Sequence, residues 1–71
     1  NILSDSLFSF YDKLNILDLS YCWIKLIGQY SFHKLNRLID LRLNNNMIKS
    51  LNGSLINLTN LESIDLSNNL I

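Results

Sequence analysis

One eleven-residue pattern occurs three times in this chain, and it constrains the fold more than any other feature. Each copy has apolar residues at its first, fourth, sixth and eleventh positions, and a Cys or an Asn at its ninth. The copies begin at Leu14, Leu38 and Leu61, so they recur after 24 and then 23 residues. Self-similarity at such a period indicates a repeat architecture, in which each repeat buries its apolar face only by stacking on its neighbours.

The pattern divides the chain into four segments. Residues 14–37 and 38–60 are two complete repeats, residues 1–13 are the second half of another repeat, and residues 61–71 are the first half of a further one. The terminal repeat of such a stack needs a polar cap, and none follows Ile71. We therefore expect the chain to be a truncated fragment of a longer repeat array.

Each copy of the pattern contains a short strand. Side chains alternate between the two faces of a strand, so the fourth and sixth positions face inward together. Stacking these strands gives a parallel sheet, and an Asn at the ninth position can bond to backbone groups of the turn. This turn slot holds Cys22, Asn46 and Asn69. The prediction is an α/β fold, a right-handed solenoid with its sheet on the concave face and loops or short helical turns on the convex face.

The segments between the strands repeat as well. Phe32 and Leu55 occupy the same large apolar position, and Phe8 precedes Phe32 by one repeat. We expect Phe8 and Phe32 to stack beneath the sheet.

Several functions lack their sequence signatures. The only histidine, His33, has no nucleophile or metal-ligand cluster beside it, so we expect no enzyme, no metal and no cofactor. The formal net charge is zero, which gives no nucleic-acid signature. No apolar run approaches the roughly 18–20 residues that a membrane span requires. Cys22 is the only cysteine and cannot form an internal disulfide.

Two rows of outward positions are candidates for partner binding, one on the strands and one just beyond them that includes Trp23 and Met47. Asp18, Arg42 and Asp65 take the same strand position in successive repeats, so Arg42 is expected to lie between two carboxylates. The alternative without a binding role is a surface row of ion pairs that contributes little to stability. The tentative set of partner-binding residues combines this concave face with the strand edge that follows it, and comprises Asp18, Ser20, Tyr21, Trp23, Arg42, Asn44, Met47 and Asp65.

Two glycosylation sequons lie in one return segment, at Asn52-Gly53-Ser54 and at Asn57-Leu58-Thr59. Both are expected on the convex side, away from the concave face. Their presence favours a secretory route for the protein.

The sequence resembles the leucine-rich repeats of Toll-like receptor ectodomains. The resemblance rests on the spacing of Ile27, Phe32 and Leu35 and on the run Leu17–Ile24, which is similar to the LDLS-x-C-x-I of lipid-sensing members. It implies a non-enzymatic recognition module in innate immune sensing, either in the extracellular part of a membrane receptor or in a secreted protein. The implied partner is a protein co-receptor or a pathogen-derived ligand, and a receptor dimer would form through regions outside this chain. Asp18 and Ser20 fall on positions that contribute to co-receptor contact in such receptors.

Other interpretations remain open at this stage. The repeats could be a structural spacer, or part of an adhesion or matrix protein. They could also belong to a cytosolic or microbial interaction protein, in which the sequons are accidental and Cys22 is a reduced thiol. Repeats of plant receptor kinases fit less well, because residues 49–52 lack their G-x-I-P step.

Overall fold

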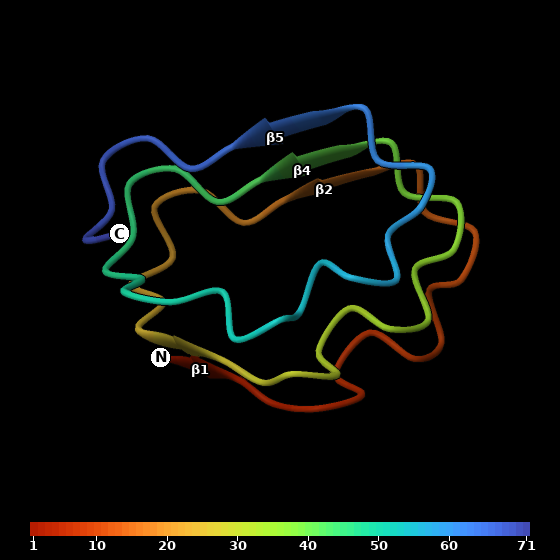
Figure 1. Cartoon of the computed structure of the whole chain (residues 1–71), viewed down its shortest axis with the longest axis horizontal. Coiled ribbons are helices and arrows are strands. Elements are labelled where there is room, and N and C mark those ends of the chain that lie inside the picture. Colours follow the sequence, from red (N-terminus) through yellow and green to blue (C-terminus); the bar gives the residue numbers. More distant parts are fainter.

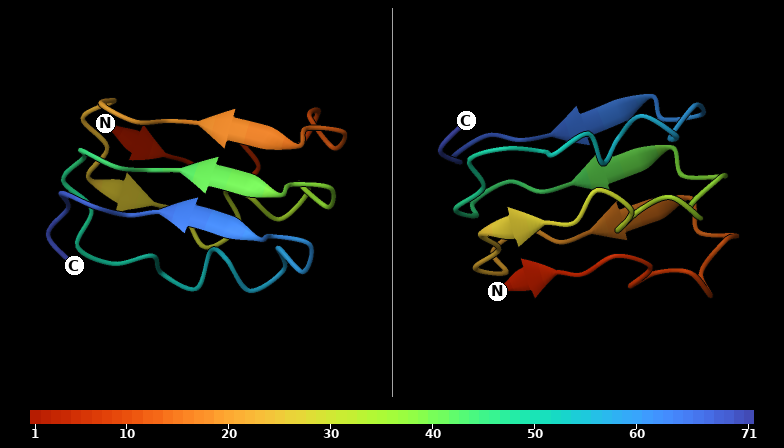
Figure 2. Two further views of the ribbon diagram at one scale, coloured as in Figure 1. Left: turned by 90° about the horizontal axis from the view of Figure 1, so that it is seen from above. Right: turned by 60° about the horizontal axis from the view of Figure 1, so that its bottom comes forward.

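The computed structural model describes residues 1–71 and stacks the chain as a series of similar turns (Figures 1 and 2). The secondary structure consists of short strands alone. These are β1 (Ile2–Leu3), β2 (Ile16–Asp18), β3 (Leu26–Ile27), β4 (Asp40–Arg42) and β5 (Ser63–Asp65).

The strands of the repeated pattern form one parallel sheet in the order β2-β4-β5. Ile16 lies opposite Asp40, and Asp40 lies opposite Ser63, so the register follows the repeat lengths of 24 and 23 residues. The predicted parallel sheet is therefore confirmed.

A second sheet, which the sequence analysis did not predict, lies on the opposite side of the stack (Figure 1). It pairs β1 with β3 in parallel, with Leu3 opposite Ile27. These two side chains are buried, whereas Ile2 and Leu26 point outward and are 67% and 59% exposed. The alternation of period two makes each segment a short strand.

No helix forms in the return segments, so the α part of the predicted α/β class is wrong. Of the two predicted alternatives, loops or short helical turns, the structure has loops with hydrogen-bonded turns. The amide of Tyr11 donates to the carbonyl of Phe8, and Leu35 and Leu58 repeat this bond to Phe32 and Leu55. Each return segment has separate turn bonds of this kind but no run of consecutive ones. Helix nucleation fixes several residues for one hydrogen bond and needs a longer run to become favourable.

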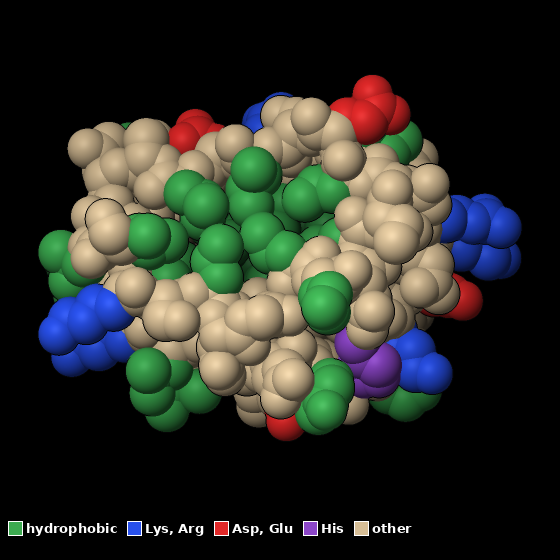
Figure 3. All heavy atoms as spheres, viewed as in Figure 1, with side chains coloured by type: hydrophobic (Ala, Val, Ile, Leu, Met, Phe, Trp, Pro, Cys, Tyr) green, Lys and Arg blue, Asp and Glu red, His purple; other side chains and the backbone are tan.

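The core is best covered in the middle of the stack. Leu41, Leu43 and Ile48 are fully buried, whereas Ile64 in the last strand is 38% exposed. Figure 3 looks onto one end of the stack, where apolar side chains gather inside a ring of polar and backbone atoms. Phe32 is fully buried and stacks on Phe8 with ring centroids 5.9 Å apart, as predicted.

Two equivalent serines in the return segments differ in their bonding. The Ser31 hydroxyl lies 2.8 Å from the carbonyl oxygen of Leu3, in the preceding repeat. The Ser54 hydroxyl is buried and has no hydrogen-bond partner. The carbonyl of Ile27, which corresponds to that of Leu3, instead accepts a hydrogen bond from Asn52 Nδ2 at 3.3 Å.

We predict that alanine destabilises the protein at position 31 but not at position 54. Ser31→Ala should lower the free energy of unfolding by about 1 kcal/mol, because it removes the hydroxyl's hydrogen bonding to the carbonyls of Leu3 and Ser4. Ser54→Ala removes only an unpaired hydroxyl and should be neutral, or should stabilise by up to about 1 kcal/mol. Urea unfolding of both variants measures the difference, and equal losses would contradict this account.

Candidate functional site

The outward side chains of β2, β4 and β5, with the serines that follow β2 and β5, form a polar stripe across the three-stranded sheet. We use the name polar stripe for Asp18, Ser20, Asp40, Arg42, Asp65 and Ser67. Asp18 lies opposite Arg42, and Arg42 lies opposite Asp65, so the stripe brings these three predicted residues into one row. All three are exposed.

Arg42 has a hydrogen-bond partner that was not predicted. Its Nη2 and Nε donate to Asp40 Oδ2 at 2.8 and 3.1 Å, whereas its shortest approach to Asp18 is 4.0 Å. The hydrogen bond and the charge of Asp40 raise the pKa of Arg42 above its ordinary value. Arg42 therefore lies between Asp18 and Asp65 in the register, as predicted, and pairs with Asp18 at 4.0 Å, but its hydrogen bonds go to Asp40, which was not predicted. Asp40 lies two residues earlier on the same strand face, and this D-x-R spacing was the missed signal.

The carboxylates of Asp18 and Asp65 are held by the serines two residues after them. The Ser20 amide and hydroxyl donate to Asp18 Oδ1 at 3.0 and 2.6 Å, and Ser67 makes the same bonds to Asp65. These hydrogen bonds lower the pKa of both carboxyl groups, because they favour the charged form. Ser20 therefore orients a charge, and the stripe presents a negative, a positive and a negative group in successive repeats.

The turn slot is built as predicted. Asn46 Nδ2 donates to the carbonyls of Leu19 and Leu43, and its Oδ1 accepts from the amides of Cys22 and Ile24. Asn69 bonds in the same way to the carbonyls of Leu43 and Leu66 and to the amide of Ile48. Cys22 is half-buried and packs against the core, and its Sγ donates a hydrogen bond to the Ser20 carbonyl at 3.3 Å. Asn44 is also half-buried, and its carbonyl accepts a hydrogen bond from the Tyr21 amide at 3.1 Å.

Tyr21, Trp23 and Met47 lie apart from the polar stripe, beyond the strand ends. With Asn45, Asn46 and Asn68 they line an open hollow of about 470 Å³. Tyr21 and Trp23 are 72% and 71% exposed and have positive φ angles of 56° and 58°. Asn45 and Asn68 take the Tyr21 position in the following repeats, also at positive φ, a conformation that Asn tolerates better than an aromatic residue. The bulky residues therefore carry backbone strain of about 1–3 kcal/mol each.

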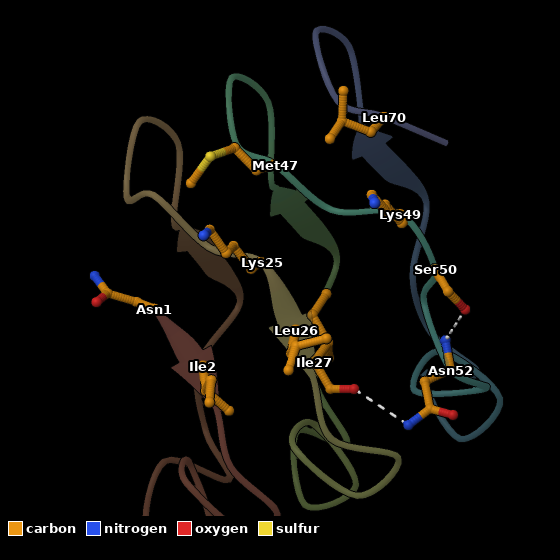
Figure 4. Close-up of a pocket in the computed structure, with 10 residues that line it drawn as sticks. All are labelled: Asn1, Ile2, Lys25, Leu26, Ile27, Met47, Lys49, Ser50, Asn52 and Leu70. Atoms are coloured by element: carbon orange, nitrogen blue, oxygen red, sulfur yellow. Dashed lines mark hydrogen bonds between the residues drawn. The ribbon is translucent and has the colours of Figure 1, made fainter.

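A larger hollow, of about 840 Å³, lies beside β1 and β3 and was missed by the sequence analysis (Figure 4). Lys25, Leu26 and Lys49 line it, and Met47 lines both hollows. The recurrence of Lys at positions 25 and 49, one repeat apart, was the available signal.

The two sequons differ in their surroundings. Asn52 is exposed, but its Nδ2 is bonded to the Ile27 carbonyl and the Ser54 side chain of its sequon is buried. Asn57 and Thr59 are both exposed. Asn52 also lines the larger hollow, so it lies closer to a candidate binding surface than expected.

No constellation for catalysis or metal binding appears. His33 is half-buried, and its Nδ1 lies 2.6 Å from the carbonyl oxygen of Tyr30. No three His, Cys, Asp or Glu side chains are grouped so that they could hold a metal ion. The structure also contains no helix with the length and apolar character that crossing a membrane demands.

Comparison with known protein families agrees with the stacked turns and the bonded asparagines. The model described as leucine rich repeat matches residues 12–71. The chain belongs to the leucine-rich repeat family. Leucine-rich repeats are generally non-catalytic modules that bind proteins, so this family membership gives the chain a general class of function. No curated protein and no solved structure matched the chain.

Proposed function

We propose that this leucine-rich repeat segment recognises a protein partner through its polar stripe, within the extracellular ectodomain of a Toll-like type of receptor. The observation that carries the proposal is the row of Asp18, Arg42 and Asp65, exposed and alternating in charge across three strands. The partner would be a protein co-receptor or a pathogen-derived ligand whose surface presents the complementary order of charges.

The charged groups of the stripe are held in place before a partner arrives. Ser20 and Ser67 hold the two carboxylates, and Asp40 holds the guanidinium of Arg42. Side chains that are already ordered lose less conformational entropy when they bind. The stacked turns would form part of a right-handed solenoid with this sheet on its concave face, and signalling would follow from receptor dimerisation elsewhere.

Two features support an extracellular setting. The run Leu17–Ile24 is similar to the LDLS-x-C-x-I of Toll-like receptors, and Asp18 and Ser20 fall within it. The Asn57 sequon is exposed at both its Asn and its Thr. We expect Asn57 to carry a glycan in the native protein, and mass spectrometry of the occupied sequons would test this.

The proposed function predicts that the stripe carries affinity. In the intact receptor, Asp18→Ala combined with Asp65→Ala should weaken co-receptor binding about tenfold, which corresponds to 1.4 kcal/mol. The partner would be identified by cross-linking at the cell surface, and its affinity then measured by surface plasmon resonance.

The matched control is Asp12→Ala combined with Glu62→Ala, which removes two exposed carboxylates outside the stripe. Unchanged affinity in the double variant would favour the spacer interpretation. Equal loss in the control would show that only net charge matters.

A further inference from the structure

A second surface, separate from the polar stripe, lies on the flank of the stack beside β3. We call it the basic apolar strip and define it by Lys25, Leu26, Ile27, Met47, Lys49 and Leu70. These residues come from successive repeats and line one hollow (Figure 4). Leu26 and Leu70 are each 59% exposed, so an apolar surface is open to solvent here.

The strip carries positive charge without a counter-charge. Neither Lys25 nor Lys49 forms an ion pair, and no Asp or Glu is among the residues that line the hollow. The two lysines occupy the same position in adjacent repeats. Next to them, the Met47 amide donates to the Ile24 carbonyl at 2.8 Å and so joins the two repeats. Like charges on adjacent layers repel one another, and an anionic partner would relieve that repulsion.

The strip continues into the aromatic hollow through Met47, which lines both. There, Tyr21 and Trp23 are held exposed at positive φ, a strained conformation that persists only where the surrounding structure enforces it. Strain of this kind concentrates at binding sites, and Trp and Tyr are the residues most enriched where interfaces gain their affinity. The flank thus combines apolar area, aromatic anchors and two free cations.

We propose that the basic apolar strip binds an acidic peptide segment of a partner protein. An apolar side chain of the peptide would lie against Leu26, Met47 and Leu70, and its carboxylates would pair with Lys25 and Lys49. An anionic membrane suits the strip less well. Each lysine adds only about 1 kcal/mol near an anionic bilayer, and recognition of such a surface usually takes a cluster of 4–8 basic residues.

A fluorescence titration tests the proposal, with Trp23 as the reporter because it is the only tryptophan in the chain. The probe is a synthetic peptide without Trp, in which a central Leu-Phe is flanked by Glu residues. We expect a saturable change in Trp23 emission that weakens as salt is added. Lys25→Glu combined with Lys49→Glu should weaken binding at least tenfold.

The matched control, Lys13→Glu with Lys34→Glu, makes the same charge change at exposed return-segment positions and should bind as the parent does. Asp18→Ala with Asp65→Ala should also leave peptide binding intact, which separates this proposal from that of the polar stripe.

The proposal is overturned if a Lys-flanked peptide binds equally well. It is equally overturned if the Lys25 and Lys49 variant binds unchanged, or if phosphatidylserine vesicles bind and the peptide does not. Circular dichroism of each variant shows that the fold is retained.

Discussion

Asn46→Ala is expected to lower the free energy of unfolding by about 3–5 kcal/mol, the largest loss for any polar substitution in this chain. The Asn46 side chain is buried and joins two repeats through a single amide group. Its loss would strand the carbonyl of Leu19 and the amides of Cys22 and Ile24, whereas the carbonyl of Leu43 would keep its bond from Asn69. Each buried backbone group left without a partner costs about 1–3 kcal/mol, and the bond to the Ile24 amide is buried. Guanidinium unfolding followed by circular dichroism measures the effect.

Asn69→Ala is the matched control for this prediction. Asn69 occupies the same slot in the last repeat, but its side chain is only half-buried, so its stranded groups can reach water. We expect a smaller loss, of about 1–2 kcal/mol. Asn46→Cys should fall between the parent and Asn46→Ala, because a thiol keeps one weak donor, as Cys22 does in contact with Ser20. Losses of equal size at positions 46 and 69 would show that burial is not the cause.

The features that the sequence predicted correctly are those that one repeat imposes on its neighbour. Alternation of period two requires Leu41 and Leu43 to share a face, and only a stacked strand can cover them. The Asn slot is equally constrained, because a turn that leaves the sheet must satisfy its own backbone groups. These requirements act over short distances, so the parallel sheet, its register and the bonded asparagines could all be inferred from spacing.

The features that were missed depend on choices between competing partners. Arg42 can reach a carboxylate on its own strand or on either neighbouring strand, and only side-chain geometry selects Asp40. The β1–β3 sheet gave a weak signal because each strand has only two residues. The larger hollow arises where residues of successive repeats meet, and nothing within one repeat specifies its shape.

A glycan would affect the proposed surfaces differently at the two sequons. Asn52 lines the basic apolar strip's hollow, so a glycan there would cover the surface proposed for the acidic peptide. Asn57 does not line that hollow, and both it and Thr59 are exposed. The proposals are therefore compatible when the sugar is on Asn57 and Asn52 keeps its bond to the Ile27 carbonyl. Glycan mapping thus bears on both surfaces at once.

Phe32→Ala is expected to lower the free energy of unfolding by about 3–5 kcal/mol. The ring is fully buried, and its stacking on Phe8 at an interplanar angle of 17° ties the first return segment to the second. Alanine would leave a cavity and would remove the aromatic contact, which itself contributes about 0.5–1.5 kcal/mol. Phe32→Leu is the matched control, because Leu55 fills this position in the next repeat; it should cost only about 1–2 kcal/mol. Thermal and urea unfolding of both variants would rank them. If Phe32→Leu proved as damaging as Phe32→Ala, the position would depend on the aromatic stack rather than on the volume that it fills.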